Sequence, residues 1–110
     1  MDIAFENHGE KSVIRLGGLS RFSSPAAEKV KARFMNILES TDNSKFLVDM
    51  SEVEGIDSSG ISALITLFRE VRNRQGAMLL CGVKNSVKIV LELTRLNEIF
   101  EFSASVEAAI

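Results

Sequence analysis

The most informative stretch of the chain reads Phe46-Leu-Val-Asp-Met-Ser-Glu-Val-Glu-Gly-Ile-Asp-Ser-Ser-Gly60. Its apolar beginning predicts a short strand that is covered by helices, and its Asp-Ser-Ser-Gly ending is typical of a helix N-terminus. Because a helix N-terminus presents unpaired N–H groups and the positive end of the helix dipole, a phosphate on a hydroxyl there would meet hydrogen-bond donors. Ser58 or Ser59 is therefore a candidate for regulatory phosphorylation.

The composition is that of an ordinary globular protein, and 110 residues suit a single domain spanning residues 1–110. A net charge of -2 offers no basic surface for nucleic acid. The apolar runs end well before the roughly 18 residues that a membrane span requires, and the N-terminus lacks the pattern of a secretory signal. The single cysteine, Cys81, is expected to be a small core residue. We therefore expect a cytoplasmic protein that binds neither nucleic acid nor membrane.

Alternating apolar residues predict an N-terminal hairpin, with strands around Ile3-Ala-Phe5 and Val13-Ile-Arg-Leu16 and with His8 in the turn. A helix is expected to follow, with Ser24 as its N-cap and Pro25 at its first position, and to continue to about residue 40.

The second half of the chain alternates between helical and strand patterns. The expected elements after the Phe46–Met50 strand are a helix from Ser58 to Gln75 stopped by Gly76, a strand at Ala77–Cys81, a helix at Ser86–Leu93, a strand at Ile99–Phe102 and a helix at Ser105–Ala109. The sequence thus predicts an α/β fold in which an N-terminal hairpin leads into a mostly parallel sheet of about four to five strands with about four helices.

Residues for common catalytic chemistry are missing from this pattern. The lone His8 has no nucleophile and acid beside it in the expected fold, so a catalytic triad is not expected. The carboxylates of Glu52, Glu54 and Asp57 fit a solvated acidic loop better than a Mg²⁺ site, and Gly17-Gly18 lacks the remainder of a phosphate-binding loop. We expect no catalytic residue, no metal and no cofactor, and hence a protein that is not an enzyme.

Two motifs resemble a known family. The 46–60 stretch is similar to the strand, loop and Asp-Ser-Ser/Ala-Gly helix start of stand-alone STAS domains, the anti-sigma factor antagonists of bacterial partner-switching systems. A second segment, Val87-Lys-Ile-Val-Leu-Glu-Leu-Thr-Arg-Leu-Asn-Glu-Ile-Phe100, looks like the family's next helix, turn and last strand. The resemblance covers most of residues 45–110.

The resemblance implies that Ser58, with Ser59 as second choice, is phosphorylated by a serine kinase that is also an anti-sigma factor. The unphosphorylated protein would bind that kinase and release the sigma factor, and a PP2C-type phosphatase would remove the phosphate. ATP would belong to the kinase. The expected partner-binding residues are Asp57, Ser58, Ser59, Gly60 and Ile61, together with Leu19, Arg21 and Phe22.

One loop departs from the family pattern. Such antagonists commonly carry acidic residues after the second strand, whereas Gly18-Leu-Ser-Arg-Phe22 has none and places Arg21 near the expected acidic position. Leu19 and Phe22 are then expected to form an apolar contact patch. Gly60 is expected to keep the approach to the Ser58 hydroxyl free of side chains.

Other interpretations of these residues stay open. Either serine can simply cap the helix, with Asp57 as another cap, and the arginines Arg69, Arg72 and Arg74 either form a solvated face or meet an acidic partner. The chain can also be an accessory STAS-like subunit of a transporter or stress-signalling complex that carries no phosphate. Nucleotide binding is a third hypothesis, which the absence of a phosphate-binding loop disfavours.

Overall fold

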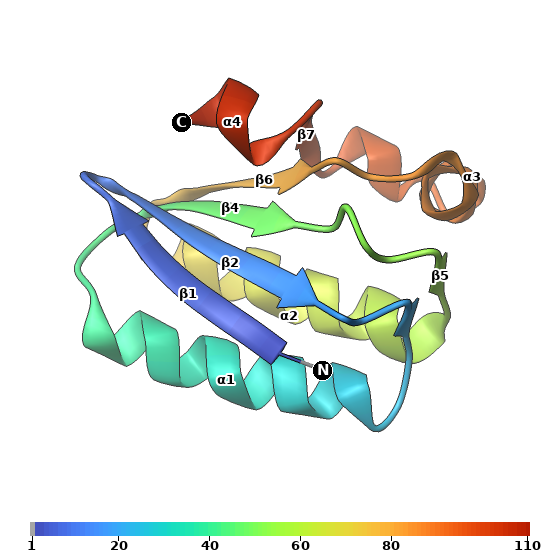
Figure 1. Cartoon of the computed structure of the whole chain (residues 1–110), viewed down its shortest axis with the longest axis horizontal. Helices are drawn as coiled ribbons and strands as arrows, with labels where there is room; N and C mark the ends of the chain where they lie inside the picture. Colours follow the sequence, from blue (N-terminus) through green and yellow to red (C-terminus); the bar gives the residue numbers. More distant parts are fainter. Residues whose placement is uncertain (1) are drawn as a thin grey trace.

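The structure is a computed structural model that describes residues 2–110. Three strands come first in the chain, and helices and strands are interspersed after them (Figure 1). The elements are β1 (Asp2–His8), β2 (Lys11–Gly17), β3 (Arg21–Phe22), α1 (Ala26–Ser40), β4 (Lys45–Asp49), β5 (Gly55–Ile56), α2 (Ser58–Asn73), β6 (Ala77–Cys81), α3 (Asn85–Leu93), a 3₁₀ turn (Leu96–Glu98), β7 (Glu101–Ser103) and α4 (Val106–Ala109).

A five-stranded sheet in the order β1-β2-β4-β6-β7 forms the centre of the fold. The first two strands are an antiparallel hairpin, and each of the other three strands runs parallel to its neighbour. The predicted fold class is therefore confirmed. His8 ends β1, directly before the turn in which it was expected.

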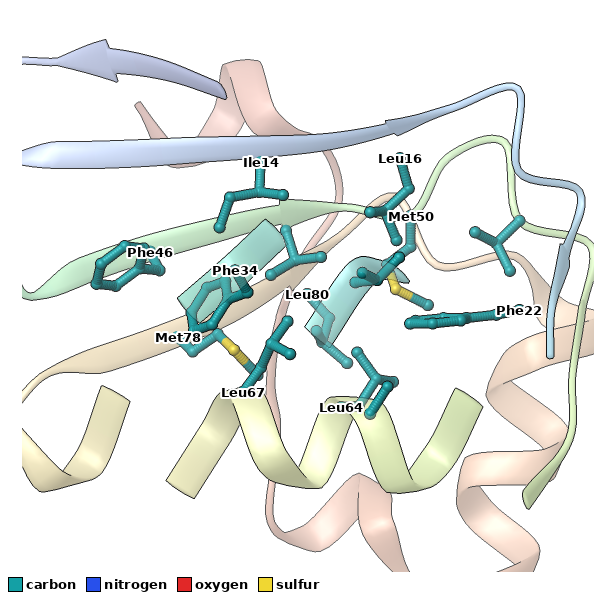
Figure 2. Packing of buried hydrophobic residues seen from close by; sticks show 14 of the residues in the cluster. Ile14, Leu16, Phe22, Phe34, Phe46, Met50, Leu64, Leu67, Met78 and Leu80 are labelled. Atoms are coloured by element: carbon teal, nitrogen blue, oxygen red, sulfur yellow. The ribbon is translucent and has the colours of Figure 1, made fainter. Parts of the chain in front are cut away.

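Helices α1 and α2 cover one face of this sheet, whereas the short α4 lies on the other (Figure 1). Because neighbouring residues of a strand point to opposite faces, β4 contributes Phe46 and Val48 to the main core and Leu47 to the opposite face. In the main core the rings of Phe34 and Phe46 meet edge to face, and Leu67 of α2 lies below them in the view of Figure 2. Burial of this core is the main source of stability.

The opposite face of the sheet carries a smaller buried cluster. Val13, Leu47 and Cys81 are covered there by Val106 of α4. The expectation that Cys81 is a core residue is confirmed, and burial raises the pKa of its thiol to about 11.

Two helix ends differ from the sequence predictions. The hydroxyl of Ser24 donates to Glu28 Oε1 at 2.5 Å instead of accepting from the backbone, and the N-cap position belongs to Pro25. At the end of α2 the left-handed residue is Gln75, with φ of 58°, and not Gly76. Gly76 is needed for space, because a Cβ there would collide with the carbonyl oxygen of Ser44.

Arg74 joins the ends of the two helices below the sheet. Its guanidinium donates to the carbonyl oxygens of Leu38 at 2.6 Å, Thr41 at 2.9 Å and Asn43 at 3.0 Å. The C-terminal carbonyls of a helix lack partners within the helix, so this side chain satisfies the end of α1 from the end of α2. Arg74 is thus a structural residue whose guanidinium donates to carbonyl oxygens within the domain.

We predict that Arg74→Met lowers the free energy of unfolding by about 1–3 kcal/mol, because buried carbonyl groups lose a charged donor. Urea denaturation followed by circular dichroism measures the change. The matched control is Arg33→Met on the exposed side of α1, which should change stability by less than about 0.5 kcal/mol. Equal effects of the two substitutions would contradict the structural role of Arg74.

Candidate functional site

The candidate site is the N-terminus of α2. Asp57 is its N-cap, and its carboxylate accepts from the N–H groups of Ser59 at 2.9 Å and Gly60 at 3.3 Å. The Ser58 side chain is exposed and makes no hydrogen bond within residues 3–110, whereas Ser59 is half-buried. The structure therefore assigns the cap to Asp57 and leaves the hydroxyl of Ser58 available.

The cap made by Asp57 changes which hydrogen-bond donors a phosphate on Ser58 would find. The sequence led us to expect free N–H groups at the helix start, but those of Ser59 and Gly60 already bind the Asp57 carboxylate. The carboxylate of Asp57 is itself a negative charge at this position, directly before Ser58 in the chain. A phosphate on Ser58 would thus add charge beside existing negative charge.

The loop before α2 is held by a segment that the sequence did not predict to be a strand. The two-residue strand β3 pairs in parallel with β5, so that Arg21 lies beside Gly55 and Phe22 beside Ile56. The carbonyl of Ser20 also accepts from Glu54 N at 2.7 Å and from Gly55 N at 3.1 Å. These bonds fix the chain immediately before Asp57.

Gly60 is buried, and its role is a different one from that predicted. A Cβ at this position would collide with the carbonyl oxygen of Phe22 and lie 2.7 Å from Ile56 Cγ1. Gly60 therefore allows α2 to contact the backbone of β3, and the expectations that it keeps the Ser58 hydroxyl accessible and touches a partner are wrong.

The predicted apolar patch in the β2–β3 loop is also wrong. Leu19 and Phe22 are buried in the main core, with exposed fractions of 5% and 0%. Their side chains anchor the segment that supports α2, so they are not available to a partner. Arg21, which points away from this core, is exposed and forms no ion pair within residues 3–110.

The carboxylates near the site have separate surroundings. Glu52 accepts from the N–H of Gly18 at 3.3 Å, Glu54 lies 4.0 Å from Lys84 Nζ, and Asp57 caps the helix. Across the described residues, no group of three His, Cys, Asp or Glu side chains is placed to hold a metal ion.

Ser58 stands at one end of a shallow groove along the outer side of α2. Half-buried Ile61 and Ile65 form its floor, and Arg69 lies at the far end. The neighbouring α3 exposes two large apolar side chains, Ile89 at 55% and Leu93 at 79%. Thr94, the C-cap residue of α3, also lines the groove, so exposed Leu93 is next to it in the chain. Exposed apolar side chains of this kind are typical of a protein-binding surface. This groove was not predicted from the sequence beyond Ile61.

The family model described as STAS domain matches residues 3–109. The chain belongs to the STAS domain family. The Listeria monocytogenes anti-sigma-B factor antagonist is 32% identical over 54 residues, which are 49% of this chain and 47% of that protein. The chain thus spans about half the length of that curated relative. BtrV of Bordetella bronchiseptica, provisionally named an anti-sigma factor antagonist, is 26% identical over 79% of this chain and 74% of its own.

Solved structures share the fold of this STAS domain. An anti-sigma-factor antagonist domain protein from Planctomyces limnophilus has a TM-score of 0.85 at 22% identity, covering 97% of this chain and 92% of its own. Phosphorylated SpoIIAA from Bacillus has a TM-score of 0.72 at 19% identity, and the match covers 98% of this chain and 96% of that chain. A sulfate transporter family protein from Wolinella succinogenes has a TM-score of 0.68 at 22% identity, and the match covers 91% of this chain and 81% of that chain. Of the described helices, none has the length and apolarity that crossing a membrane requires.

We predict that Gly60→Ala destabilises the protein by about 1–3 kcal/mol or more, because the new methyl group collides with the backbone of Phe22. Gly55→Ala is the matched control, since a Cβ there lies 3.6 Å from only the flexible end of Arg21. Thermal unfolding of both variants compares them. A Gly60→Ala protein as stable as Gly55→Ala would show that the close contact is not required.

Two substitutions of Asp57 distinguish the contribution of its hydrogen bonds to stability from the contribution of its negative charge. Asp57→Ala should cost about 1 kcal/mol of stability because the N–H groups of Ser59 and Gly60 lose their acceptor. Asp57→Asn keeps an acceptor oxygen and should stay within about 0.5 kcal/mol of the original protein. Chemical denaturation is the measurement, and equal losses in the two variants would contradict a capping role.

Proposed function

We propose that this STAS domain is an anti-sigma factor antagonist that binds a serine kinase/anti-sigma factor and is switched off by phosphorylation of Ser58. The observation that supports this most directly is the exposed Ser58 hydroxyl at the start of α2, next to a separate residue, Asp57, that caps the helix. Modification of Ser58 therefore leaves the cap in place.

The physical effect of the phosphate is local. It adds roughly two negative charges next to Asp57 without replacing any hydrogen bond that holds α2. Under a docked protein the dianion would be desolvated and repelled, which costs several kcal/mol, or on the order of 10²-fold or more in affinity. The fold is kept while the complex is lost.

The surface that contacts the partner extends from Ser58 along the α2 groove. Ile61 and Ile65 provide apolar area there, and exposed Leu93 provides more on α3. Arg69 lines the groove as an exposed cation, and Arg21 is an exposed cation on β3, beside Gly55 of the strand that precedes α2. Apolar contacts supply affinity and charges supply selectivity, so the partner should carry complementary acidic residues.

The reset step belongs to other proteins. A PP2C-type phosphatase removes the phosphate in this proposal, and the kinase brings its own ATP, so the STAS domain itself binds no cofactor and catalyses no reaction. All of these events take place in the cytoplasm.

The test uses the serine kinase/anti-sigma factor of the source organism with Mg²⁺ and ATP. Intact mass and peptide mapping should find one phosphate, on Ser58, in the original protein and in Ser59→Ala, and none in Ser58→Ala. By calorimetry, Ser58→Ala should bind the kinase like the unmodified protein and Ser58→Asp about 10²-fold more weakly. Binding of both Ser58 variants with unchanged affinity would contradict the switch.

The accessory-subunit alternative uses the same contact face without phosphate. Phosphopeptide analysis of the protein from its native cells separates the alternatives: phosphorylated Ser58 supports the antagonist, and a persistently unmodified protein that copurifies with a larger complex supports the accessory role.

A further inference from the structure

The face of the sheet opposite α1 and α2 is only partly covered. Helix α4 comprises the four residues Val106–Ala109 and shields Val13, Leu47 and Cys81 (Figure 1). Beside it, Ala77 and Leu79 of β6 remain half-exposed. Between α4 and these strands lies a hollow of about 380 Å³, within the roughly 300–1,000 Å³ that small-molecule sites occupy.

Two lysines stand at the rim of this hollow. Lys11 of β2 and Lys45 of β4 are directly paired in the parallel register, so their side chains leave the sheet on the same face. Like charges at paired positions destabilise a sheet. Lys11 donates to the carbonyl oxygen of Ala109 at 2.7 Å, and neither lysine forms an ion pair within residues 3–110. The charged side chains that line this hollow are thus both cationic, and the carboxylates of Glu10 and Asp42 border an adjoining hollow that Lys45 shares.

The floor of the hollow is apolar. Its main surface is Leu79, with Leu47, the neighbour of Leu79 across β4 and β6, only 1% exposed beneath it. Ala77, at the end of the row that begins with Lys11 and Lys45, extends this floor, and Phe102 and Ser103 of β7 complete the lining. Alanines 108 and 109 of α4 close one side. A charged rim next to a narrow apolar floor fits a molecule with one anionic end and one short apolar chain.

We propose that this hollow binds a small amphipathic monoanion, a medium-chain carboxylate in its simplest form. The carboxylate lies between Lys11 and Lys45, and the alkyl chain lies over Leu79 against α4. The charge pair selects an anion, and the limited length of the floor selects a short chain. The site is on the other side of the sheet from Ser58 and does not depend on the proposed function.

Nuclear magnetic resonance of the full chain tests the proposal with three probes below micelle-forming concentrations: octanoate, octanol and acetate. Octanoate should shift the methyl signals of Leu47, Leu79 and Ala109 and bind at least tenfold more tightly than the other two. Octanol has the chain without the charge, and acetate has the charge without the chain.

Lys45→Gln should weaken octanoate binding about tenfold and leave the weak binding of octanol unchanged. The control Lys29→Gln removes an exposed charge from α1 and should leave both unchanged. Equal binding of octanoate and octanol, equal binding of octanoate and acetate, or octanoate shifts centred on Ile89 and Leu93 would each overturn the proposal. Sedimentation of the ligand-free protein as a dimer with Leu79 protected from solvent would also overturn it, in favour of a second copy as the occupant.

Discussion

The contact between α2 and the backbone of β3 constrains the N-terminal end of α2, where Ser58 lies. Because Gly60 has no side chain, the helix reaches the carbonyl of Phe22, and the N–H groups of Glu54 and Gly55 bind the carbonyl of Ser20. Leu19 and Phe22 then fill the core from the same segment. Together these interactions determine that Asp57 caps the helix and that Ser58 faces solvent. The Ser58 hydroxyl is thus exposed because Gly60, Leu19 and Phe22, which support the start of α2, are buried.

The two faces of the sheet have different roles in this molecule. One face is covered by α1 and α2, whose ends are joined by Arg74, and it carries most of the buried apolar residues. The other face holds a small cluster under a helix of four residues. Surface exposed on α2 and α3 suits protein contacts, whereas the thinly covered face is suited to a small molecule. A single 110-residue chain therefore has room for two independent binding surfaces.

Much of the fold could be predicted from the sequence, because its longer elements have strong periodicity. Alternation in the hairpin and helical spacing in α2 lead directly to an α/β sheet. The two-residue strands β3 and β5 are too short to show any period, so the neighbourhood of Arg21 and Gly55 was missed. Leu19 and Phe22 were predicted to be exposed because a local apolar pattern does not reveal that the segment crosses the end of a distant helix. The capping role of Asp57 was predictable from residue type, but the contacts of Gly60 and Arg74 depend on tertiary structure.

Glycines at both ends of α2 restrict how a signal can leave this helix. Gly60 meets the Phe22 carbonyl at one end, and Gly76 meets the Ser44 carbonyl just beyond the other. The close packing against backbone at each end opposes movement of α2 toward these two segments. The proposed phosphate on Ser58 would then act without displacing the helix that carries it. Information would pass only to a molecule that touches the modified surface, as a change in electrostatic potential and not as a change in shape.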